Sequence, residues 1–509
     1  LRLHPINKFV VWTFFLWVAI ANRNWMANQF QSVKIRLRSF HLAALLFGLF
    51  TTLLAILKTT GLPEIFDEGA YHLPLIRMWE GQGLVPGMAN LNGHYGLNST
   101  WHLLSAFTNL NFLPFWNTSM VLNGLVASFL GWFAADRLQR ILDSSGRVSD
   151  WIVIFLPIFI FRNLLSSPST DIPAIICSWF IFTLWLENIE KEESPWEIWP
   201  VLVILPIWTI LLKASSAPLL LIPLGMILLS RKQKNFRNLF VLLAIGLLML
   251  FPWMLQNWFL SGYAIFPVRL TAIGNPEWQV PISSIDKKFY LEQFGAFAPP
   301  ERYNWEWFST WFRAHNGDTK VILILSLSAM VSVLIALIRH SAQRVWAKVY
   351  LYATVLVCLI TWLLTITEPR YGFGALVFSA LFPLAIVLRK TARFRPELKL
   401  NYIAVGVVVV FSSNVWKTVL EFKGNKNTIL APSERPRVAF RNLMCGNFVA
   451  TTPVVYLSEV PEGKPVFCWD CPFPCVPKEG IDDSTQIEKM SFGPYEGFRF
   501  AKGKPQRDQ

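Results

Sequence analysis

Apolar runs long enough to cross a bilayer recur along this chain and constrain its fold more than any other feature. Most are about 18 to 21 residues long, the length that an α-helix needs to span the hydrocarbon core. Eleven runs can be delimited, at residues 40–58, 118–135, 150–162, 172–187, 197–212, 216–230, 238–258, 320–338, 346–366, 371–388 and 402–419. Charged residues make up only 15% of the chain, against about 25% in soluble proteins. We therefore predict an all-α polytopic membrane protein with about eleven transmembrane helices.

The basic residues gather in alternate short loops between the apolar runs. The net charge is +14, which in a soluble protein would suggest nucleic acid as a partner. Here the basic loops lie at 137–147, 231–237, 339–348 and 389–399. This alternation is typical of the positive-inside bias, so we expect membrane lipids as partners and no nucleic acid. The loop at 188–195 is acidic and is the single exception, and acidic residues count little in this rule.

The same bias predicts where the larger segments lie. Residues 1–39 form a cytoplasmic or interfacial segment, in which 1–25 are either not native or a short interfacial helix, because the apolar run 9–21 is short for a span and Met26 precedes basic residues. Residues 40–421 form the transmembrane body, with large outer loops at 59–117 and 259–319. Residues 422–509 form a small outer C-terminal module.

Ionisable residues from several separate segments fall on the predicted outer side. They are Asp67 and Glu68, Asp171, Lys213, and Arg370. Ionisable groups near a membrane are functional candidates by default. A carboxylate can take the proton of an incoming hydroxyl or amine, and Lys and Arg can hold a phosphate that leaves with a lipid.

Each of these residues also has a structural interpretation. Asp67 and Glu68 precede a helix expected at 69–79, where the helix dipole favours acidic residues. Asp171 is placed to cap the helix that continues through Pro173. Lys213 can snorkel to the interface, and Arg370 can anchor there. The membrane loops contain no Asp-x-Asp and no zinc-type His/Cys cluster, so we leave metal ligands unassigned and expect no divalent metal to be required.

The tail is rich in cysteine. Four of the six cysteines lie there, at Cys445, Cys468, Cys471 and Cys475. Outside the cell disulfides are favoured, and four cysteines allow three pairings. A redox or zinc role for the Cys468–Cys471 pair is the alternative. Cys177 and Cys358 fall in apolar runs and are expected to be inert.

Several segments of this chain look familiar. They are the outer Asp67-Glu68 pair, the runs 71–76, 85–87, 90–92 and 96–99, Trp101, Lys213 with its serine pair, Pro252-Trp253, 261–263, 266–267, and the tail segment 468–475. Through them residues 40 to 480 resemble the glycosyltransferase C superfamily, nearest to its protein O-mannosyltransferase and aminoarabinose transferase branch, and closest to a group of poorly characterised bacterial multi-pass proteins. A basic residue is expected near the end of the seventh span, where this chain has Gln256.

The resemblance implies the role of each candidate residue. Asp67 is the carboxylate that activates the acceptor, and Glu68 is the second acid of the pair. Lys213 and Arg370 are ligands of the donor phosphate. Beyond what the resemblance implies, we assign Asp171, Tyr71 and His72 to the same substrate site. The implied donor is a polyprenyl-phosphate sugar, and the acceptor is a lipid, glycan or protein at the periplasmic face of the bacterial inner membrane.

Two other functions stay open. The chain can be a transporter or flippase of a lipid-linked or anionic substrate, or a non-catalytic subunit of an envelope assembly. Transporters hold their substrates near the bilayer midplane and often contain internal repeats. Here the ionisable residues lie at one face and no repeat is evident, which favours the enzyme.

Overall fold

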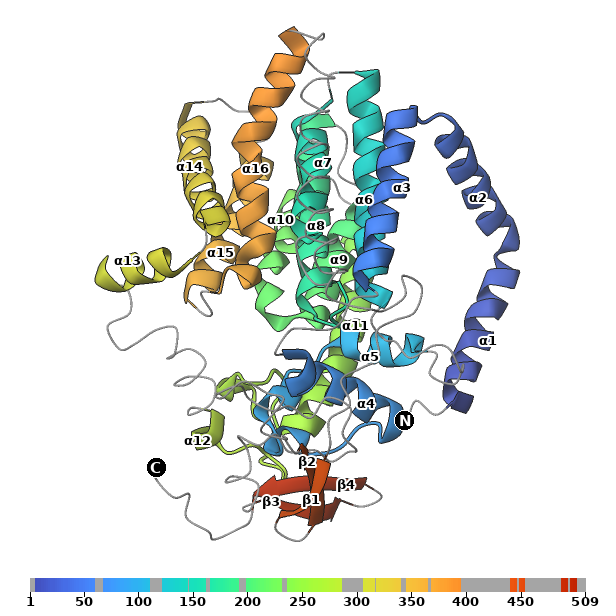
Figure 1. The fold of residues 1–509 in the computed structure, drawn as a ribbon, viewed down its shortest axis with the longest axis vertical. Coiled ribbons are helices and arrows are strands. Elements are labelled where there is room, and N and C mark those ends of the chain that lie inside the picture. Colours follow the sequence, from blue (N-terminus) through green and yellow to red (C-terminus); the bar gives the residue numbers. More distant parts are fainter. Residues whose placement is uncertain are drawn as a thin grey trace.

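The computed structural model describes residues 5–59, 67–109, 121–144, 146–161, 165–191, 198–230, 236–285, 305–315, 317–339, 345–364, 368–394, 440–445, 448–453, 487–492 and 495–500. These residues are mostly helical. A bundle of long helices runs along the longest axis of the molecule (Figure 1). It consists of α3 (Leu42–Thr59), α6 (Val121–Asp143), α7 (Val148–Ile160), α8 (Asp171–Lys191), α9 (Trp199–Leu212), α10 (Leu221–Ser230), α11 (Phe236–Ser261), α14 (Gly317–Arg339), α15 (Val345–Leu364) and α16 (Pro369–Phe394).

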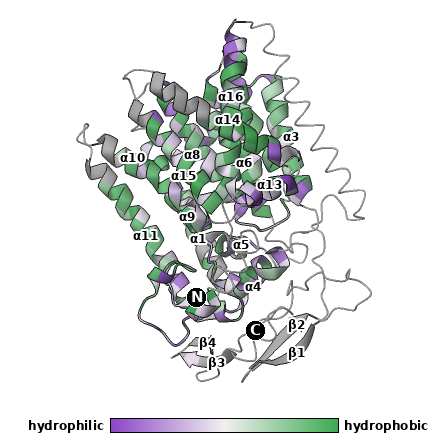
Figure 2. Cartoon of the chain, turned by 90° about the vertical axis from the view of Figure 1, so that its left-hand side faces the viewer, coloured by the Kyte–Doolittle hydropathy of each residue, from purple (hydrophilic) through white to green (hydrophobic). Residues whose placement is uncertain are grey.

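Four helices among the described residues are long and apolar enough to cross a membrane. They cover Leu42–Thr59, Asp171–Lys191, Phe240–Ser261 and Pro369–Phe394. Figure 2 shows that the bundle is largely hydrophobic along its length. Each predicted apolar run in the described part of the chain overlaps a helix, whereas the run 402–419 lies outside the described residues. The membrane character of the chain is thus supported, and the number of spans stays a prediction.

Small residues allow α3 and α6 to approach closely. A Cβ atom on Gly131 would lie 2.1 Å from Thr51 Oγ1, and one on Gly124 would lie 2.2 Å from Thr59 Cγ2. Close approach through small residues is a common way to pack helices in membranes. The centre of the bundle is filled by large rings from α7, α8 and α16, including the fully buried Trp151, Trp179 and Phe378.

The segments predicted to be outside gather at one end of the bundle, which we call the outer end (Figure 1). The first loop contributes η1 (Glu68–His72), α4 (Leu73–Gly81), η2 (Met88–Asn90), η3 (Gly93–Gly96) and α5 (Thr100–Thr108), and the second contributes η6 (Arg269–Thr271), α12 (Ile282–Ile285) and α13 (Trp305–Ala314). The first loop docks on the end of α11, where Gly87 N donates to Phe259 O over 2.8 Å.

The tail adds two antiparallel hairpins that we did not expect from the sequence. They are β1 (Phe440–Cys445) with β2 (Phe448–Pro453), and β3 (Ile487–Phe492) with β4 (Tyr495–Phe500). Strand β4 lies against the first loop, because Phe498 N donates to Pro86 O over 2.9 Å. At Gly87, φ is +66° and an added Cβ would lie 1.9 Å from Phe498 O. Glycine is needed for this contact.

The N-terminal helices α1 (Pro5–Ala21) and α2 (Arg23–Arg38) run beside the bundle (Figure 1). Near the middle of α1, Trp12 stacks on Phe107 of α5, with ring centroids 5.3 Å apart. Near the end of α2, Arg36 Nη2 lies 2.7 Å from Asp136 Oδ1 at the inner end of α6. The segment therefore extends along the height of the bundle. It contacts both the first loop and the inner end of α6, and its placement relative to a membrane stays a prediction.

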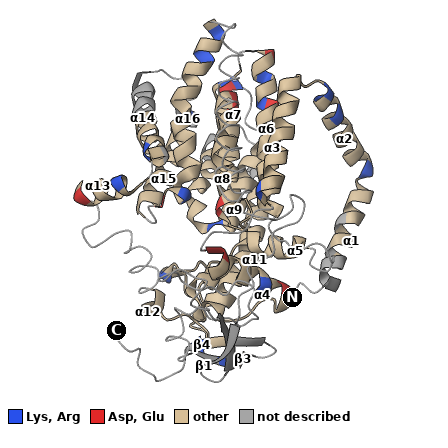
Figure 3. Ribbon diagram, viewed as in Figure 1, with Lys and Arg blue, Asp and Glu red and all other residues tan. Residues whose placement is uncertain are grey.

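Charged residues occur towards both ends of the bundle (Figure 3). At the inner end, opposite the outer loops, Arg137 Nη2 lies 2.7 Å from Glu187 Oε2, and Arg140 Nη1 lies 2.6 Å from Glu187 Oε1. Glu190 accepts the backbone N–H of Val148 over 2.8 Å. The acidic residues at the end of α8 thus pair with one of the basic loops. Within the acidic segment 188–195, Glu190 Oε1 also lies 3.7 Å from Arg389 Nη1, so this residue has a cationic partner.

Candidate functional site

Four candidate residues from separate elements meet at the outer end of the bundle. Arg370 Nη2 donates to Asp67 Oδ2 over 2.7 Å. The ammonium group of Lys213 donates to Asp171 Oδ1, and Arg370 Nε lies 3.9 Å from Asp171 Oδ2. Two carboxylates and two cations therefore form one alternating cluster. Because opposite charges at this spacing attract, each holds the next in place.

Local structure presents these four side chains at the ends of helices. Asp67 directly precedes η1, and its side chain makes no capping hydrogen bond. Asp171 begins α8, where its backbone N–H donates to Ser169 Oγ over 3.2 Å. Lys213 follows the last residue of α9, and Arg370 is the second residue of α16, after Pro369. The carboxylates of both aspartates thus contact the cations. A residue that only opened or capped a helix would not need these contacts.

The first loop is fixed to the end of α9 beside Lys213. Ser99 Oγ donates to Leu212 O over 2.7 Å, and Thr100 Oγ1 donates to Leu211 O over 3.1 Å. The last turn of a helix leaves carbonyl groups without an intrahelical partner, and these hydroxyls satisfy two of them. The contacts set the position of Lys213 relative to the loop that carries Asp67.

Tyr371 also belongs to the cluster and was not among the site residues predicted from the sequence. Arg370 Nη2 also donates to Tyr371 Oη over 2.9 Å, and Lys213 Nζ lies 3.6 Å from the centroid of the tyrosine ring. A cation over an aromatic face is attracted by its quadrupole. The signal available in the sequence was the adjacency of Arg370 and Tyr371 at the start of an apolar run.

One N–H of Arg370 makes no hydrogen bond within the cluster, since its Nε lies 3.9 Å from Asp171 Oδ2. Arg370 Nε is buried and has no hydrogen-bond partner among the described residues. A buried donor without a partner is destabilising. An incoming anion would satisfy it, and a phosphate oxygen is the acceptor that guanidinium groups bind well.

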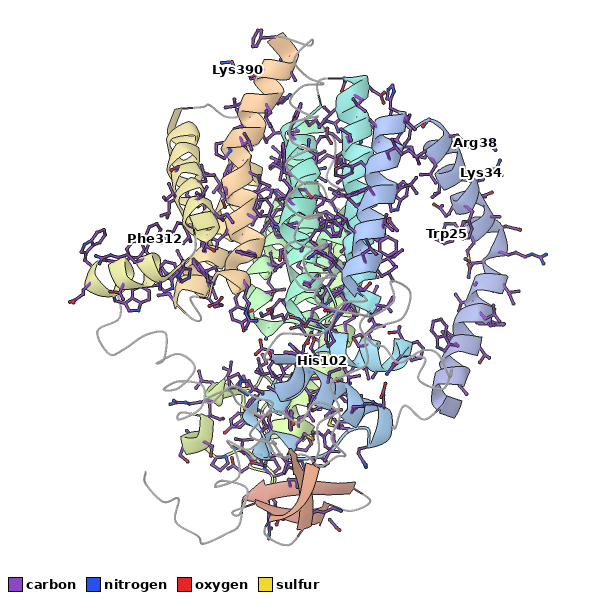
Figure 4. All side chains as sticks on the ribbon, in the orientation of Figure 1. Trp25, Lys34, Arg38, His102, Phe312 and Lys390 are labelled. Atoms are coloured by element: carbon purple, nitrogen blue, oxygen red, sulfur yellow. The ribbon has the colours of Figure 1, made fainter. Side chains whose placement is uncertain are left out.

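Histidines and a tyrosine of the first loop lie next to the cluster. His72 Nδ1 and His102 Nε2 share a hydrogen bond of 2.7 Å, and the ring of Tyr71 stacks on that of His94 with centroids 5.1 Å apart. Figure 4 places His102 at the junction between the bundle and the outer loops. His72 and His102 are both buried. Sequence spacing gave no sign of the His72–His102 pair, because 30 residues separate its members.

Burial sets the protonation of these groups. It lowers the pKa of His102 to about 3. Burial, then the neighbouring His102 and Arg370, lower the pKa of His72 well below its usual range. Both imidazoles are therefore neutral at pH 7. Burial and the nearby carboxylate of Asp67 raise the pKa of Tyr71, which keeps its hydroxyl protonated. Burial lowers the pKa of Lys213, and Asp171 opposes that shift.

Glu68 lies deeper than Asp67. It is 0% exposed and begins the π-helical turn η1, which continues into α4. The helix predicted at 69–79 is thus present, but its first turn is wider than an α-helix. Such turns occur often at functional sites. Because Glu68 is enclosed, it is suited to supporting the site, whereas Asp67 lies in the cluster itself.

Three further sequence features concern the site: the residue at position 256, a possible metal ion and the cysteines of the tail. Gln256, at the position where a basic residue was expected, accepts Asn98 Nδ2 over 3.1 Å and so links α11 to the first loop. Within the described ranges, no group of three or more His, Cys, Asp or Glu side chains is arranged to hold a metal ion. Cys445 ends β1, but its side chain is not described, and Cys468, Cys471 and Cys475 lie outside the described residues.

A family model matches residues 1–377, which is most of the chain. The chain belongs to the family described as Domain of unknown function (DUF8201). The DUF8201 match ends within α16, seven residues beyond Arg370, so it contains Asp67, Asp171, Lys213 and Arg370 and leaves the tail hairpins outside. No curated protein and no solved structure matches the chain.

Proposed function

We propose that this protein is a membrane glycosyltransferase. It transfers a sugar from a polyprenyl-phosphate donor to an envelope acceptor, a lipid, glycan or protein, at the periplasmic face of a bacterial inner membrane. The observation that carries the proposal is the meeting of Asp67, Asp171, Lys213 and Arg370 at the outer end of the bundle. A donor embedded in the bilayer would present its phosphate at such a position.

The cations supply the donor-phosphate site of the proposal. Arg370 has a buried Nε–H without a hydrogen-bond partner among the described residues. Lys213 lies on the other side of Asp171. A phosphate bound between them would replace carboxylate oxygens as their acceptor. Lys213 contributes a point charge, and Arg370 contributes a planar donor pair.

Asp67 is the proposed general base. The acceptor oxygen attacks the anomeric carbon of the sugar, and the bond from that carbon to the phosphate oxygen breaks. The polyprenyl phosphate leaves with the electron pair of that bond, and Lys213 and Arg370 stabilise its charge. The hydroxyl proton of the acceptor moves to Asp67. In this scheme Glu68 supports Asp67, and Asp171 positions Lys213.

Phosphate binding and activation of the base are linked in this arrangement. Arg370 holds Asp67 Oδ2 at 2.7 Å in the absence of donor. A phosphate that takes over the guanidinium N–H groups would release Asp67 from this bond. The released carboxylate is a stronger hydrogen-bond acceptor for the hydroxyl it must deprotonate. Tyr71 and His72 line the same region, and their neutral forms can hydrogen-bond the sugar.

The proposal is tested by following a radiolabelled sugar. Membranes that contain the wild-type chain or its Asp67→Asn variant are incubated with a mixture of labelled polyprenyl-phosphate sugars. The wild type should move label from the lipid to an acceptor that no longer extracts with the polyprenyl lipid, and the variant should not. Equal transfer by both chains would overturn the role of Asp67. Labelled lipid that changes leaflet without transfer would instead support the flippase alternative.

A further inference from the structure

Helix α13, in the second outer loop, has aromatic side chains on one side and polar side chains on the other. Its five aromatic residues are Trp305, Trp307, Phe308, Trp311 and Phe312. With 3.6 residues per turn, these rings fall on one side, and Glu306, Ser309, Thr310 and Arg313 fall on the other. A short helix that divides in this way is typical of one that lies at a membrane surface.

The position of α13 fits such a surface. In Figure 1 it lies across the direction of α14 and α16, close to the outer end of the bundle. Figure 4 places Phe312 on the part of α13 that faces the bundle. Helix α14 begins at Gly317, and its side chains Val321, Ile324 and Leu327 are exposed. Lys320 Nζ, near the start of α14, lies 5.9 Å from the ring centroid of Phe312, so the aromatic side of α13 reaches the first turn of α14.

Part of the aromatic side is covered by protein and part is not. Trp311 is buried, and its ring centroid lies 6.0 Å from that of Trp362 at the end of α15. Trp305, at the other end of the helix, is 79% exposed. A tryptophan that is exposed in this way is unfavourable in water. Trp and Phe rings are stable between the headgroups and the acyl chains.

We propose that α13 lies in the outer interface of the bilayer, with Trp305 and its neighbouring rings among the lipids and Glu306, Thr310 and Arg313 facing water. The partner is a lipid surface, which extends around the exposed apolar side chains of α14. This inference concerns membrane contact only and does not depend on the proposed transfer reaction.

The same contacts relate the lipid surface to the candidate site. Trp362, which contacts Trp311, donates its Nε1–H to Glu368 O over 2.9 Å. Glu368 lies two residues before Arg370. Helix α13 at the interface would therefore hold the start of α16 at the level of the lipid headgroups. Arg370 would then lie where the phosphate of a membrane lipid lies.

Photocrosslinking tests the orientation of α13 with a matched control on the same helix. The full chain carries p-benzoylphenylalanine in place of either Trp305 or Thr310, both exposed positions, and is reconstituted in phosphatidylethanolamine and phosphatidylglycerol vesicles with tritiated acyl chains. Illumination should label the Trp305 variant with lipid several-fold more than the Thr310 variant. Equal labelling would overturn the proposal, and so would an adduct of the Trp305 variant with a second copy or another protein.

A second measurement uses the unsubstituted chain, in case either variant fails to fold. Hydroxyl radicals generated in the water phase modify exposed tryptophans. In the same vesicles, Trp305 should be modified several-fold more slowly than a tryptophan in a free peptide, despite its exposure in the protein. Modification at the peptide rate would place Trp305 in water and contradict the proposal.

Discussion

Arg370 and Asp67 form a hydrogen-bonded ion pair of 2.7 Å although 303 residues separate them in the sequence. The pair joins the start of the first outer loop to the first turn of α16. Asp171 lies on the other side of the guanidinium group, and Lys213 lies beyond Asp171. The ion pair is thus the point at which the loop with the proposed base meets the proposed phosphate site.

The Asp67–Arg370 pair should contribute to stability as well as to function. We expect a double-mutant cycle of Asp67→Asn and Arg370→Gln to give a coupling free energy of about 1 kcal/mol. The two side chains are 17% and 33% exposed, so solvent screens the pair only partly. Unfolding in mixed micelles measures the four proteins. The more exposed Arg36–Asp136 pair is the control and should couple more weakly, and a coupling of zero at Asp67–Arg370 would refute the expectation.

Lys213 should contribute more to the affinity for phosphate than Lys320, a lysine outside the cluster. Lys213→Gln removes the charge next to Asp171, and we expect the affinity for polyprenyl phosphate to fall about ten- to hundredfold, because a hydrogen bond to a charged group is worth roughly 1.5 to 3 kcal/mol. Binding in nanodiscs measures this. Lys320 donates to Arg313 O away from the cluster, so Lys320→Gln should bind as the wild type does. Equal losses in the two variants would point to a general effect of charge.

The buried His102 predicts a loss of stability in mild acid. Its pKa is lowered to about 3 in the folded chain, whereas an unfolded histidine titrates near about 6.5. Below that value the unfolded chain binds the proton first, so stability present at pH 7 is lost as the pH falls towards the folded value. Between pH 7 and pH 5 we expect a loss of about 2 kcal/mol from this residue.

Thermal unfolding of the wild type and His102→Gln at pH 7 and pH 5 measures that loss. The variant cannot titrate at this position, so it should lose less stability than the wild type over the same interval. His72 remains in both proteins and contributes in the same direction. If the two proteins lose the same stability between pH 7 and pH 5, His102 is not the source of the pH dependence.

Glu187 should be the most sensitive residue of the inner-end network. It accepts ion pairs from Arg137 and Arg140, and both it and Arg137 are buried. Glu187→Gln removes one of two carboxylates that pair with the buried Arg137, since Asp150 Oδ1 remains 3.5 Å from Arg137 Nη1. We therefore expect the free energy of unfolding to fall by about 3 kcal/mol, the lower end for a broken buried pair. Unfolding in mixed micelles again measures the change. Arg36→Gln, at a half-exposed pair, should cost less than about 1 kcal/mol. Equal losses of the free energy of unfolding in the Glu187 and Arg36 variants would show that burial does not determine the size of the loss.

The sequence allowed us to predict that the ionisable candidate residues lie at the same end of the bundle. The alternation of basic loops predicted that Asp67, Asp171, Lys213 and Arg370 share one end, and the structure brings them together there. This works because the length of an apolar helix fixes which loops share a side. The roles of these residues in catalysis stay predictions.

Contacts between irregular segments were not predictable in the same way. The His72–His102 bond and the position of Tyr371 over Lys213 depend on how the first loop folds onto helix ends. The contact of Trp12 with Phe107 and the pairing of Arg137 with Glu187 are also tertiary. Periodicity and charge say nothing about such pairs, because each forms between elements whose relative position the sequence pattern leaves open.

Measuring binding and transfer on the same preparation of Asp67→Asn tests the central claim most directly. Nanodiscs carrying the wild type or the variant are titrated with polyprenyl phosphate and then assayed with the labelled donor. We predict that the variant binds polyprenyl phosphate at least as tightly as the wild type, because Arg370 is released from its partner, and that it transfers no sugar. A variant that transfers sugar at the wild-type rate would contradict the assignment of Asp67 as the base.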